Sequence, residues 1–389
     1  MQATNYLENY EHFKETAFNS RFLKHKTLVN LLQKLPAAFE QKLIGKSFED
    51  REIHLIKWGE GSIKIFLWSQ MHGDEATGTM ALFDLFNFLQ NPKFQSISSL
   101  LATKCTLYFL PMVNPDGAEN FSRRNAQLID INRDYHQTIT PEAAILKNIR
   151  DTIKPDFGFN LHDQSTLWSV KKTGKPATLS YLAPAFDENL SMNEVRKNAM
   201  LVIADIYHTL NNFLPNQIGL FDDEHEPRAF GDNFQAAGTS TILIEAGGLH
   251  QDEEKQEIRK YFFLSILSGL HSISTQKYIL QDIQNYLSIP KNNKEIFHIL
   301  IKDLLNQNAP YSMGICYEEE PEGNGCATQK CYIITDIGDL NHLGAYHIYE
   351  GHSHQIEGKI EINKPANFAL KKDNEIILAF KNGIIQSKL

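Results

Sequence analysis

The chain has 389 residues, which at roughly 150 residues per domain allows about two domains. Hydrophobic residues make up 42% of it and charged residues 22%, as is ordinary for a globular protein with a sizeable core. The net charge of −9 disfavours a nucleic-acid partner, which usually needs a basic face.

The N-terminal third begins with a helical pattern. Aromatic residues and leucines recur at roughly helical spacing over residues 1–44, and Pro36 interrupts the pattern. The runs "IHLIKWG" and "SIKIFLWSQ" then predict two strands joined in a hairpin by a turn at residues 59–62. "DEATGTMALFDLFNFLQNP" has acids in its first turn and ends at Asn91-Pro92, which predicts a helix.

Strands and helices alternate through the middle of the chain. "CTLYFLPMVNP", "DFGFNLHDQ" and "TSTILIEAGG" read as buried strands, and helical patterns cover residues 192–213 and 253–273. Continuous apolar strands alternating with helices indicate an α/β fold with a mixed, largely parallel sheet and helices on both faces. After about residue 290 the segments are short and β-rich, with turns at Asp373-Asn374 and Asn382-Gly383. We therefore predict an N-terminal helical segment (1–44), a main domain (45–288) and a small β-rich C-terminal domain (289–389).

The cellular compartment that we expect depends on three features: a signal peptide, a membrane-spanning helix and a disulfide framework. The first residues, "MQATNYLENYEHFKETAF", have neither the basic nor the apolar region of a signal peptide. No apolar run approaches the ~20 residues of a membrane-spanning helix. Four cysteines (Cys105, Cys316, Cys326 and Cys331) make no disulfide framework in so long a chain. We expect a cytoplasmic protein with no membrane or nucleic-acid partner, and the sequence does not indicate an oligomeric state.

Metal-binding side chains follow the predicted strands. Ligands of open α/β sheets bind beyond the carboxyl ends of the strands, and His72, Asn114, His162 and Glu245 all lie at such ends. Catalytic zinc typically takes three protein ligands, so a close pair and one distant residue make a natural site. His72 and Glu75 form the pair and His162 is the distant candidate, although polar residues of solvated turns would look the same.

Two further stretches carry chemistry. "NPDGAENFSRRNAQLIDINRDY" contains Arg123, Arg124 and Arg133, whose guanidinium groups can bind carboxylates or polarise a carbonyl oxygen. A solvated basic loop is the alternative. Glu245 ends an apolar strand, where a buried carboxylate is costly unless it has a purpose. A structural salt bridge is the alternative for Glu245.

Five motifs in order, "HGDE", "VNPDG", "RRNAQLIDINRDY", "LHDQ" and "ILIEAGG", resemble those of the M14 (carboxypeptidase A-like) zinc carboxypeptidases. The resemblance covers roughly residues 45–275. It implies one zinc ion per chain, held by His72, Glu75 and His162, because carboxypeptidase A uses two histidines and one glutamate.

The resemblance also implies roles for four other residues. Arg124 would polarise the scissile carbonyl, Asn132 and Arg133 would bind the terminal carboxylate of the substrate, and Glu245 would act as the general base. The choice of Arg124 over its neighbour rests on the "RNA" that begins at this residue.

The sequence departs from the family pattern in one place. Carboxypeptidases usually carry a tyrosine about twenty residues before the catalytic glutamate, and "GLFDDEHEPRAFGDNFQAAG" has none. Phe221, His225 and Phe230 are the candidates for its place, and the departure bears on terminal-carboxylate specificity. The three C-terminal cysteines and the histidines of "HIYEGHSH" lack a Cys-x-x-Cys pair, so we expect no second metal site.

The expected function is that of a zinc metallocarboxypeptidase, a hydrolase that removes a C-terminal residue from a peptide-like substrate. The first alternative is an N-acyl amino acid deacylase of the succinylglutamate desuccinylase and aspartoacylase kind, which the small C-terminal β domain favours. A non-catalytic zinc-bearing binding protein is the second alternative, which the intact set of His72, Glu75, His162 and Glu245 disfavours.

Overall fold

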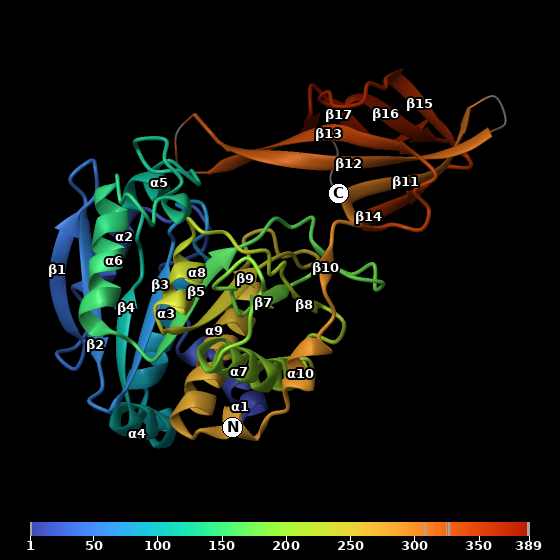
Figure 1. Ribbon diagram of the computed structural model, residues 1–389. Helices are drawn as coiled ribbons and strands as arrows, with labels where there is room; N and C mark the ends of the chain where they lie inside the picture. The colour runs from blue at the N-terminus through green and yellow to red at the C-terminus, as the bar shows by residue number, and fades with distance from the viewer. Residues whose placement is uncertain (1, 307–308, 324, 326, 387–389) are drawn as a thin grey trace. The chain divides into compact units, whose positions relative to one another are not determined.

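The computed structural model describes residues 2–306, 309–323, 325 and 327–386. The chain divides into two compact units (Figure 1), one of residues 1–166 and 177–292 and the other of residues 167–176 and 293–389. None of the described helices is both long enough and apolar enough to cross a membrane.

The larger unit is built on an eight-stranded sheet in the order β1-β2-β4-β3-β5-β9-β7-β8. Neighbouring strands are parallel from β4 through β3 and β5 to β9, and again between β7 and β8; the remaining pairs are antiparallel. The predicted mixed, largely parallel sheet is confirmed. Its strands are β1 (Glu40–Lys46), β2 (Glu52–Trp58), β3 (Ile63–Ser69), β4 (Cys105–Leu110), β5 (Phe157–Asp163), β7 (Leu179–Leu182), β8 (Ile218–Leu220) and β9 (Ser240–Ala246).

Helices cover both faces of this sheet because its central strands are apolar on both sides. Ile65 and Leu67 of β3 belong to the core cluster formed with α3 and α9, whereas Phe66 and Trp68 belong to the cluster formed with α6 and α8. The helices of this unit are α1 (Ala3–Glu8), α2 (His25–Leu32), α3 (Thr77–Gln90), α4 (Gln95–Lys104), α5 (Pro115–Glu119), α6 (Pro141–Ile153), α7 (Glu194–Leu210), α8 (Phe230–Ala236), α9 (Gln256–Ser274) and α10 (Ile283–Leu287).

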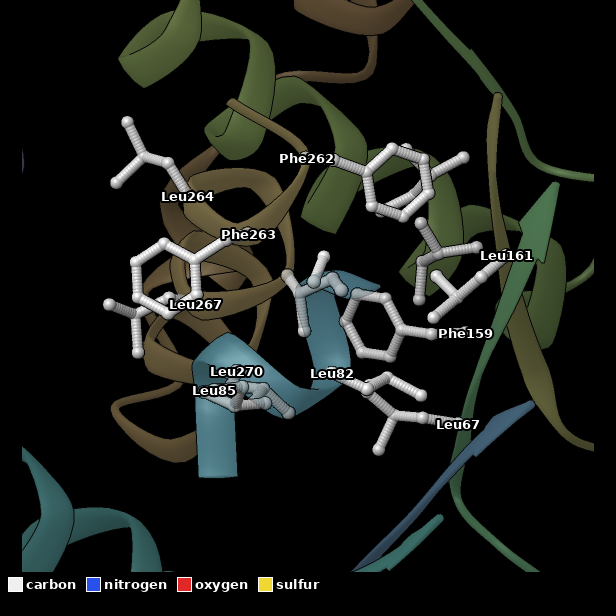
Figure 2. Close-up of a cluster of buried hydrophobic side chains, with 14 of the residues drawn as sticks. Leu67, Leu82, Leu85, Phe159, Leu161, Phe262, Phe263, Leu264, Leu267 and Leu270 are labelled. Carbon is white, nitrogen blue, oxygen red and sulfur yellow. The ribbon is translucent and has the colours of Figure 1, made fainter. Parts of the chain in front are cut away.

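The larger core holds the two site-bearing strands in place. Figure 2 shows Leu67 of β3 with Phe159 and Leu161 of β5 facing α3 and α9. Leu82 of α3 and Phe262 of α9 are among the buried side chains that meet them. Burying a side chain of this size stabilises the fold by about 1.5–3 kcal/mol. The carboxyl ends of β3 and β5 are therefore fixed next to each other.

Two local predictions were wrong. β2 and β3 exist but form no hairpin, since β4 lies between them. The glycine turn hydrogen-bonds to the start of β4 instead, with Gly61 N donating to Cys105 O at 3.1 Å. The predicted helical segment also ends early, because the edge strand β1 begins at Glu40. Most β1 side chains are exposed, so β1 lacks the apolar alternation that would have revealed a strand.

The smaller unit is β-rich, as predicted. It holds β6 (Ser169–Val170), β11 (Ile296–Asn306), β12 (Ala309–Pro321), β13 (Thr328–Gly338) and β14 (Gly344–Glu350), followed by β15 (His354–Lys359), β16 (Asn367–Lys372), β17 (Glu375–Lys381) and β18 (Ile384–Ile385); the short β10 (Asn292–Asn293) lies where the chain enters this unit. Asp373 and Asn374 have positive φ values of 51° and 69° between β16 and β17, which confirms the predicted turn there.

The cysteines form no disulfide among the described residues. Cys105, Cys316 and Cys331 are free thiols, and Cys326 lies outside the described residues. In the smaller unit, Asp303, Glu350 and His352 come within metal-binding distance of one another at the surface. Glu350 and His352 lie in the quoted "HIYEGHSH", for which the sequence predicted no second metal site, and exposed acidic groups of this kind are common without a metal.

Candidate metal centre

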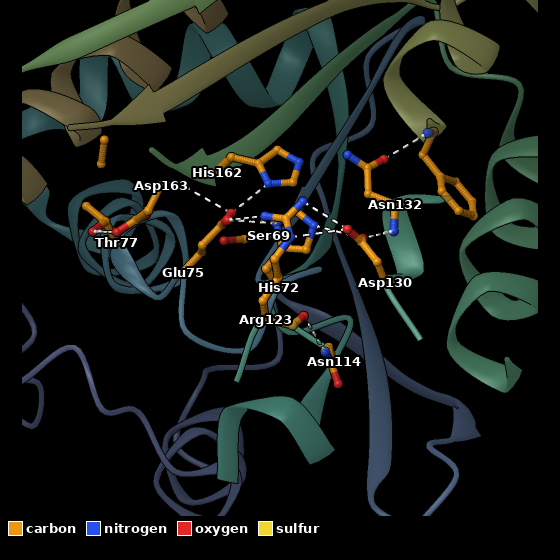
Figure 3. A network of polar contacts seen from close by, with 12 residues as sticks. Ser69, His72, Glu75, Thr77, Asn114, Arg123, Asp130, Asn132, His162 and Asp163 are labelled. Carbon is orange, nitrogen blue, oxygen red and sulfur yellow. Dashed lines mark hydrogen bonds and ion pairs between the residues drawn. The ribbon is translucent and has the colours of Figure 1, made fainter. Parts of the chain in front are cut away.

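The three predicted zinc ligands meet at the carboxyl ends of β3 and β5 (Figure 3). Their ligand atoms all lie within 4.8 Å of one another, and all three side chains are buried. The Glu75 carboxylate lies between the two histidines: Oε1 is 2.7 Å from Nδ1 of His72, and Oε2 is 2.7 Å from Nδ1 of His162.

Two glycines make this convergence possible. A Cβ on Gly73 would lie 2.0 Å from the carbonyl carbon of Gly117, so only glycine lets the turn after β3 approach α5 this closely. A Cβ on Gly78 would lie 2.7 Å from Cβ of Leu161, so the first turn of α3 approaches β5 through this glycine. Glu75 lies in the backbone segment between these glycines, and their close packing brings its side chain next to His162.

The donor set fits a zinc ion. Nε2 of His72 lies 3.1 Å from Oδ1 of Asp130, and donation to this carboxylate leaves the Nδ1 lone pair of a neutral His72 facing Glu75. Two acceptors that face each other at 2.7 Å attract a cation, and two histidines with one carboxylate are a catalytic zinc set. Asp130 was missed by the sequence analysis, although it stands in the quoted "LIDINRD".

The electrostatics of the group support the same assignment. Burial lowers the pKa of His72, but the adjacent Glu75 and Asp130 outweigh burial and raise this pKa to about 9. Burial raises the pKa of Glu75, but His72 and His162 outweigh it and hold this pKa well below its usual value. Without a metal ion, a proton is therefore held between His72 and Glu75. A metal ion that binds there would take the place of this proton, since metal ligands must be deprotonated to bind.

The structure places Arg123, rather than the predicted Arg124, at the metal centre. Nη1 of Arg123 lies 3.1 Å from Nδ1 of His72 and 3.3 Å from Oε1 of Glu75, while Nε and Nη2 both donate to Asp130 at 3.1 and 3.0 Å. Arg124 instead is exposed and donates to the carbonyl oxygen of Leu128 at 2.9 Å. Adjacent side chains of an irregular loop point in different directions, so the sequence could not decide between the two.

Asn132 and Arg133 follow Asp130 in the short helical turn Ile131–Arg133. The backbone N–H of Asn132 donates to Oδ1 of Asp130 at 2.9 Å, which ties this turn to the metal centre. Oδ1 of Asn132 accepts from the backbone N–H of Phe230 at 2.9 Å, so the donor end of the amide remains for a ligand. Arg133 forms an ion pair with Glu226, in which Nε and Oε2 are 3.1 Å apart.

Glu245 lies on β9 directly beside the third ligand. In the parallel pair of β5 and β9 it is the register partner of His162, and it is 8% exposed. Its Oε2 atom has no hydrogen-bond partner among the described residues. Burial, together with the negative charges of Glu75 and Asp163, raises the pKa of Glu245 well above its usual value. An open carboxylate of high proton affinity beside the ligands is suited to general acid–base chemistry.

The segment that lacks the family tyrosine joins β8 to α8. Phe230 begins α8 and is fully buried in the core with Phe234, so it does not close over the site. Phe221 and His225 lie in the connecting segment, which has no regular secondary structure, and both are half-buried. The structure therefore excludes Phe230 as the replacement for the family tyrosine, and Phe221 and His225 remain as candidates.

The comparisons with known proteins concern the family and the fold. Residues 25–184 match the family model of the zinc carboxypeptidases, peptidase family M14. Residues 25–184 of the chain belong to the M14 zinc carboxypeptidase family. The matched stretch includes every predicted site residue except Glu245, which lies beyond residue 184.

Individual relatives of this chain are distant. Carboxypeptidase SOL1 of Arabidopsis thaliana is 33% identical over 72 residues, which are 18% of this chain but only 15% of the plant protein. A metallo-carboxypeptidase from Burkholderia cenocepacia has a TM-score of 0.54 at 12% identity, and one from Pseudomonas aeruginosa has 0.53 at 16%. Both structural matches cover 67% of this chain and 71% of the other, and at these identities they show the zinc carboxypeptidase fold.

Proposed function

We propose that this protein is a zinc-dependent carboxypeptidase that hydrolyses a peptide-like amide next to a C-terminal residue. The observation that carries the proposal is the open carboxylate of Glu245 beside the His72, Glu75 and His162 cluster. A zinc site that served structure alone would need no unpartnered buried carboxylate beside it.

The chemistry divides among the residues of the site. Zinc bound by His72, Glu75 and His162 supplies Lewis-acid polarisation and lowers the pKa of water. Glu245 takes a proton from the attacking water and delivers it to the departing amine, a task that its high proton affinity favours. Arg123 is half exposed at the edge of the cluster and can donate to the oxygen on which negative charge develops.

The substrate's terminal carboxylate would bind at Asn132 and Arg133. Arg133 offers a guanidinium fork, which matches the two oxygens of a carboxylate, and Asn132 offers an oriented amide donor. The Pseudomonas aeruginosa relative was solved in complex with (2-guanidinoethylmercapto)succinic acid, an acid with two carboxyl groups. This supports a carboxylate-bearing ligand for the present site.

The test measures turnover of three matched substrates: an N-blocked dipeptide with a free carboxylate, its amide, and an N-acyl amino acid. We expect zinc-dependent release of the C-terminal amino acid from the first substrate, with strong loss of rate on the amide and after chelation. Preferential turnover of the acyl amino acid would establish the deacylase alternative. Zinc binding without turnover of any of the three would point to a non-catalytic protein.

A further inference from the structure

The proposed carboxylate-binding arginine already has a carboxylate partner from its own chain. Glu226 lies in the irregular segment between β8 and α8, and its Oε2 is 3.1 Å from Nε of Arg133. The same carboxylate is held by Arg228, whose Nε donates to Oε1 at 2.9 Å and whose Nη2 donates to Oε2 at 2.8 Å. Glu226 thus stands at Arg133 in the way that a substrate carboxylate would.

The backbone fixes this arrangement. The N–H of Glu226 donates to Oδ1 of Asp232 at 3.0 Å, at the start of α8. The N–H of Phe230 donates to Asn132 at 2.9 Å, and the N–H of Tyr135 donates to the carbonyl oxygen of Arg228 at 3.3 Å. The segment that carries Glu226 is therefore hydrogen-bonded to residues that precede and follow Arg133 in the chain. These contacts keep the Glu226 carboxylate close to the Arg133 side chain.

We propose that Glu226 is a resident carboxylate that occupies Arg133 until the terminal carboxylate of a substrate displaces it, and that Arg228 retains Glu226 after displacement. This inference rests on the proposed carboxypeptidase function. Glu226 would make the site selective, because only a ligand that carries its own negative charge can replace the resident one at Arg133.

The strengths of the two contacts make displacement feasible. The side chains of Glu226 and Arg133 are 27% and 36% exposed, so the ion pair between them is weak. Two parallel hydrogen bonds join Glu226 to Arg228, and such bidentate pairs are the stronger kind. A substrate carboxylate therefore has to break only the weaker contact.

Glu226 remains charged under all ordinary conditions. The hydrogen bonds from the Arg228 side chain, followed by those from its backbone and by the positive charge of Arg133, lower the pKa of Glu226 to about 2. Protonation therefore does not remove the resident carboxylate near neutral pH, and only competition for Arg133 can do so.

The test uses the full-length, zinc-loaded protein and measures equilibrium binding by calorimetry. The probes are N-acetyl-phenylalanine and N-acetyl-phenylalanine amide, which differ only in the terminal charge. We expect Glu226→Gln to bind the acid about fivefold more tightly, as removal of an exposed ion-pair competitor would give, with amide binding unchanged. Glu224→Gln is the matched control, because it removes the same charge from an exposed residue of the same segment; we expect no change.

Two outcomes would overturn the inference. Unchanged or weaker acid binding in Glu226→Gln would mean that Glu226 orients Arg133 or plays no part at the site. An equal gain in Glu224→Gln would mean that the effect is general electrostatics rather than displacement.

The retaining role of Arg228 is tested by a double-mutant cycle. Arg228→Ala alone should weaken acid binding, because Glu226 then has only Arg133 as a partner. In the Glu226→Gln background the same change should have no effect, whereas a further loss of acid binding would show that Arg228 contacts the ligand directly and would overturn this role.

The binding measurements separate this inference from the proposed function. If no peptide is hydrolysed but Glu226→Gln still binds the acid more tightly, the function fails and the inference stands. If peptides are hydrolysed but the two probes respond equally to Glu226→Gln, the inference fails and the function stands.

Discussion

Lys255 forms a buried ion pair with Asp163, the residue that follows His162 and whose backbone N–H donates to Oε2 of Glu75 at 3.1 Å. Nζ of Lys255 is 3.0 Å from Oδ2 of Asp163, and the two side chains are 4% and 5% exposed. Nζ also donates to the carbonyl oxygen of Ala246 at 2.9 Å, and Oδ2 accepts from the Thr77 hydroxyl at 2.6 Å. One ammonium group therefore joins the ends of β5 and β9, the strands that present His162 and Glu245.

Removal of this ammonium group should destabilise the protein. Lys255→Ala leaves the Asp163 carboxylate buried without its ion-pair partner, and breaking a buried pair in this way costs about 3–5 kcal/mol. Urea unfolding at a fixed zinc concentration measures the loss. Lys260→Ala is the control, because its ion pair with Glu257 is partly exposed and such pairs contribute at most about 1 kcal/mol. Equal, small losses in both variants would contradict a structural role for the Lys255 pair.

Zinc should bind with a stoichiometry of one per chain and should depend on His162. His162→Ala removes one of three converging ligands from separate parts of the chain, and two ligands on a single turn hold the ion poorly. Elemental analysis after extensive dialysis measures the bound metal. His208→Ala changes an exposed histidine on α7 and should retain zinc. Full zinc content in His162→Ala would rule out this ligand assignment.

The two adjacent arginines should differ sharply. Arg123→Ala removes a guanidinium group that reaches His72 and Glu75, and loss of a main oxyanion donor lowers turnover on the order of a hundredfold or more. Arg124→Ala removes a contact to a single loop carbonyl and should stay within a fewfold of the wild type. The measurement is kcat on a peptide with a free carboxylate. The opposite ranking of the two variants would restore the assignment made from sequence.

The sequence revealed those parts of the site that follow from strand ends. His72, His162 and Glu245 close continuous apolar runs, and parallel strands place such ends at one edge of the sheet. The assignment of His72, Glu75 and His162 as the ligand set came instead from the resemblance to the M14 carboxypeptidases, because Glu75 does not end a strand. The β-rich C-terminal unit could also be predicted from the sequence. Residues such as Asp373 and Asn374 favour turn conformations on their own, so they indicate a turn without any long-range contact.

Relations that depend on long-range packing could not be predicted. β4 separates β2 from β3, although the two apolar runs and the glycine turn between them have the local signature of a hairpin. The direction of Arg123 depends on how its loop packs against the cluster. The partnership of Glu226 with Arg133 joins residues far apart in the chain, and neither side chain stands in a periodic pattern that would indicate it.

Glu245 is the residue whose replacement best separates chemistry from binding. Glu245→Gln keeps the size of the side chain but removes the basic oxygen that could take a proton. The variant should fold and bind zinc normally, because Glu245 is not one of the three ligands and its Oε2 makes no hydrogen bond within the described structure. The melting temperature should stay close to the wild-type value, because one buried polar group of the same size replaces another.

Turnover should fall in Glu245→Gln by the 10²–10⁴-fold typical of a general acid–base, or more. Binding of N-acetyl-phenylalanine should stay close to the wild-type value, because Asn132 and Arg133 are unchanged. The measurements are kcat, zinc content, melting temperature and the dissociation constant of this product-like acid. Activity within a fewfold of the wild type, with zinc and stability intact, would show that Glu245 moves no proton, and the mechanism proposed for this site would have to be abandoned.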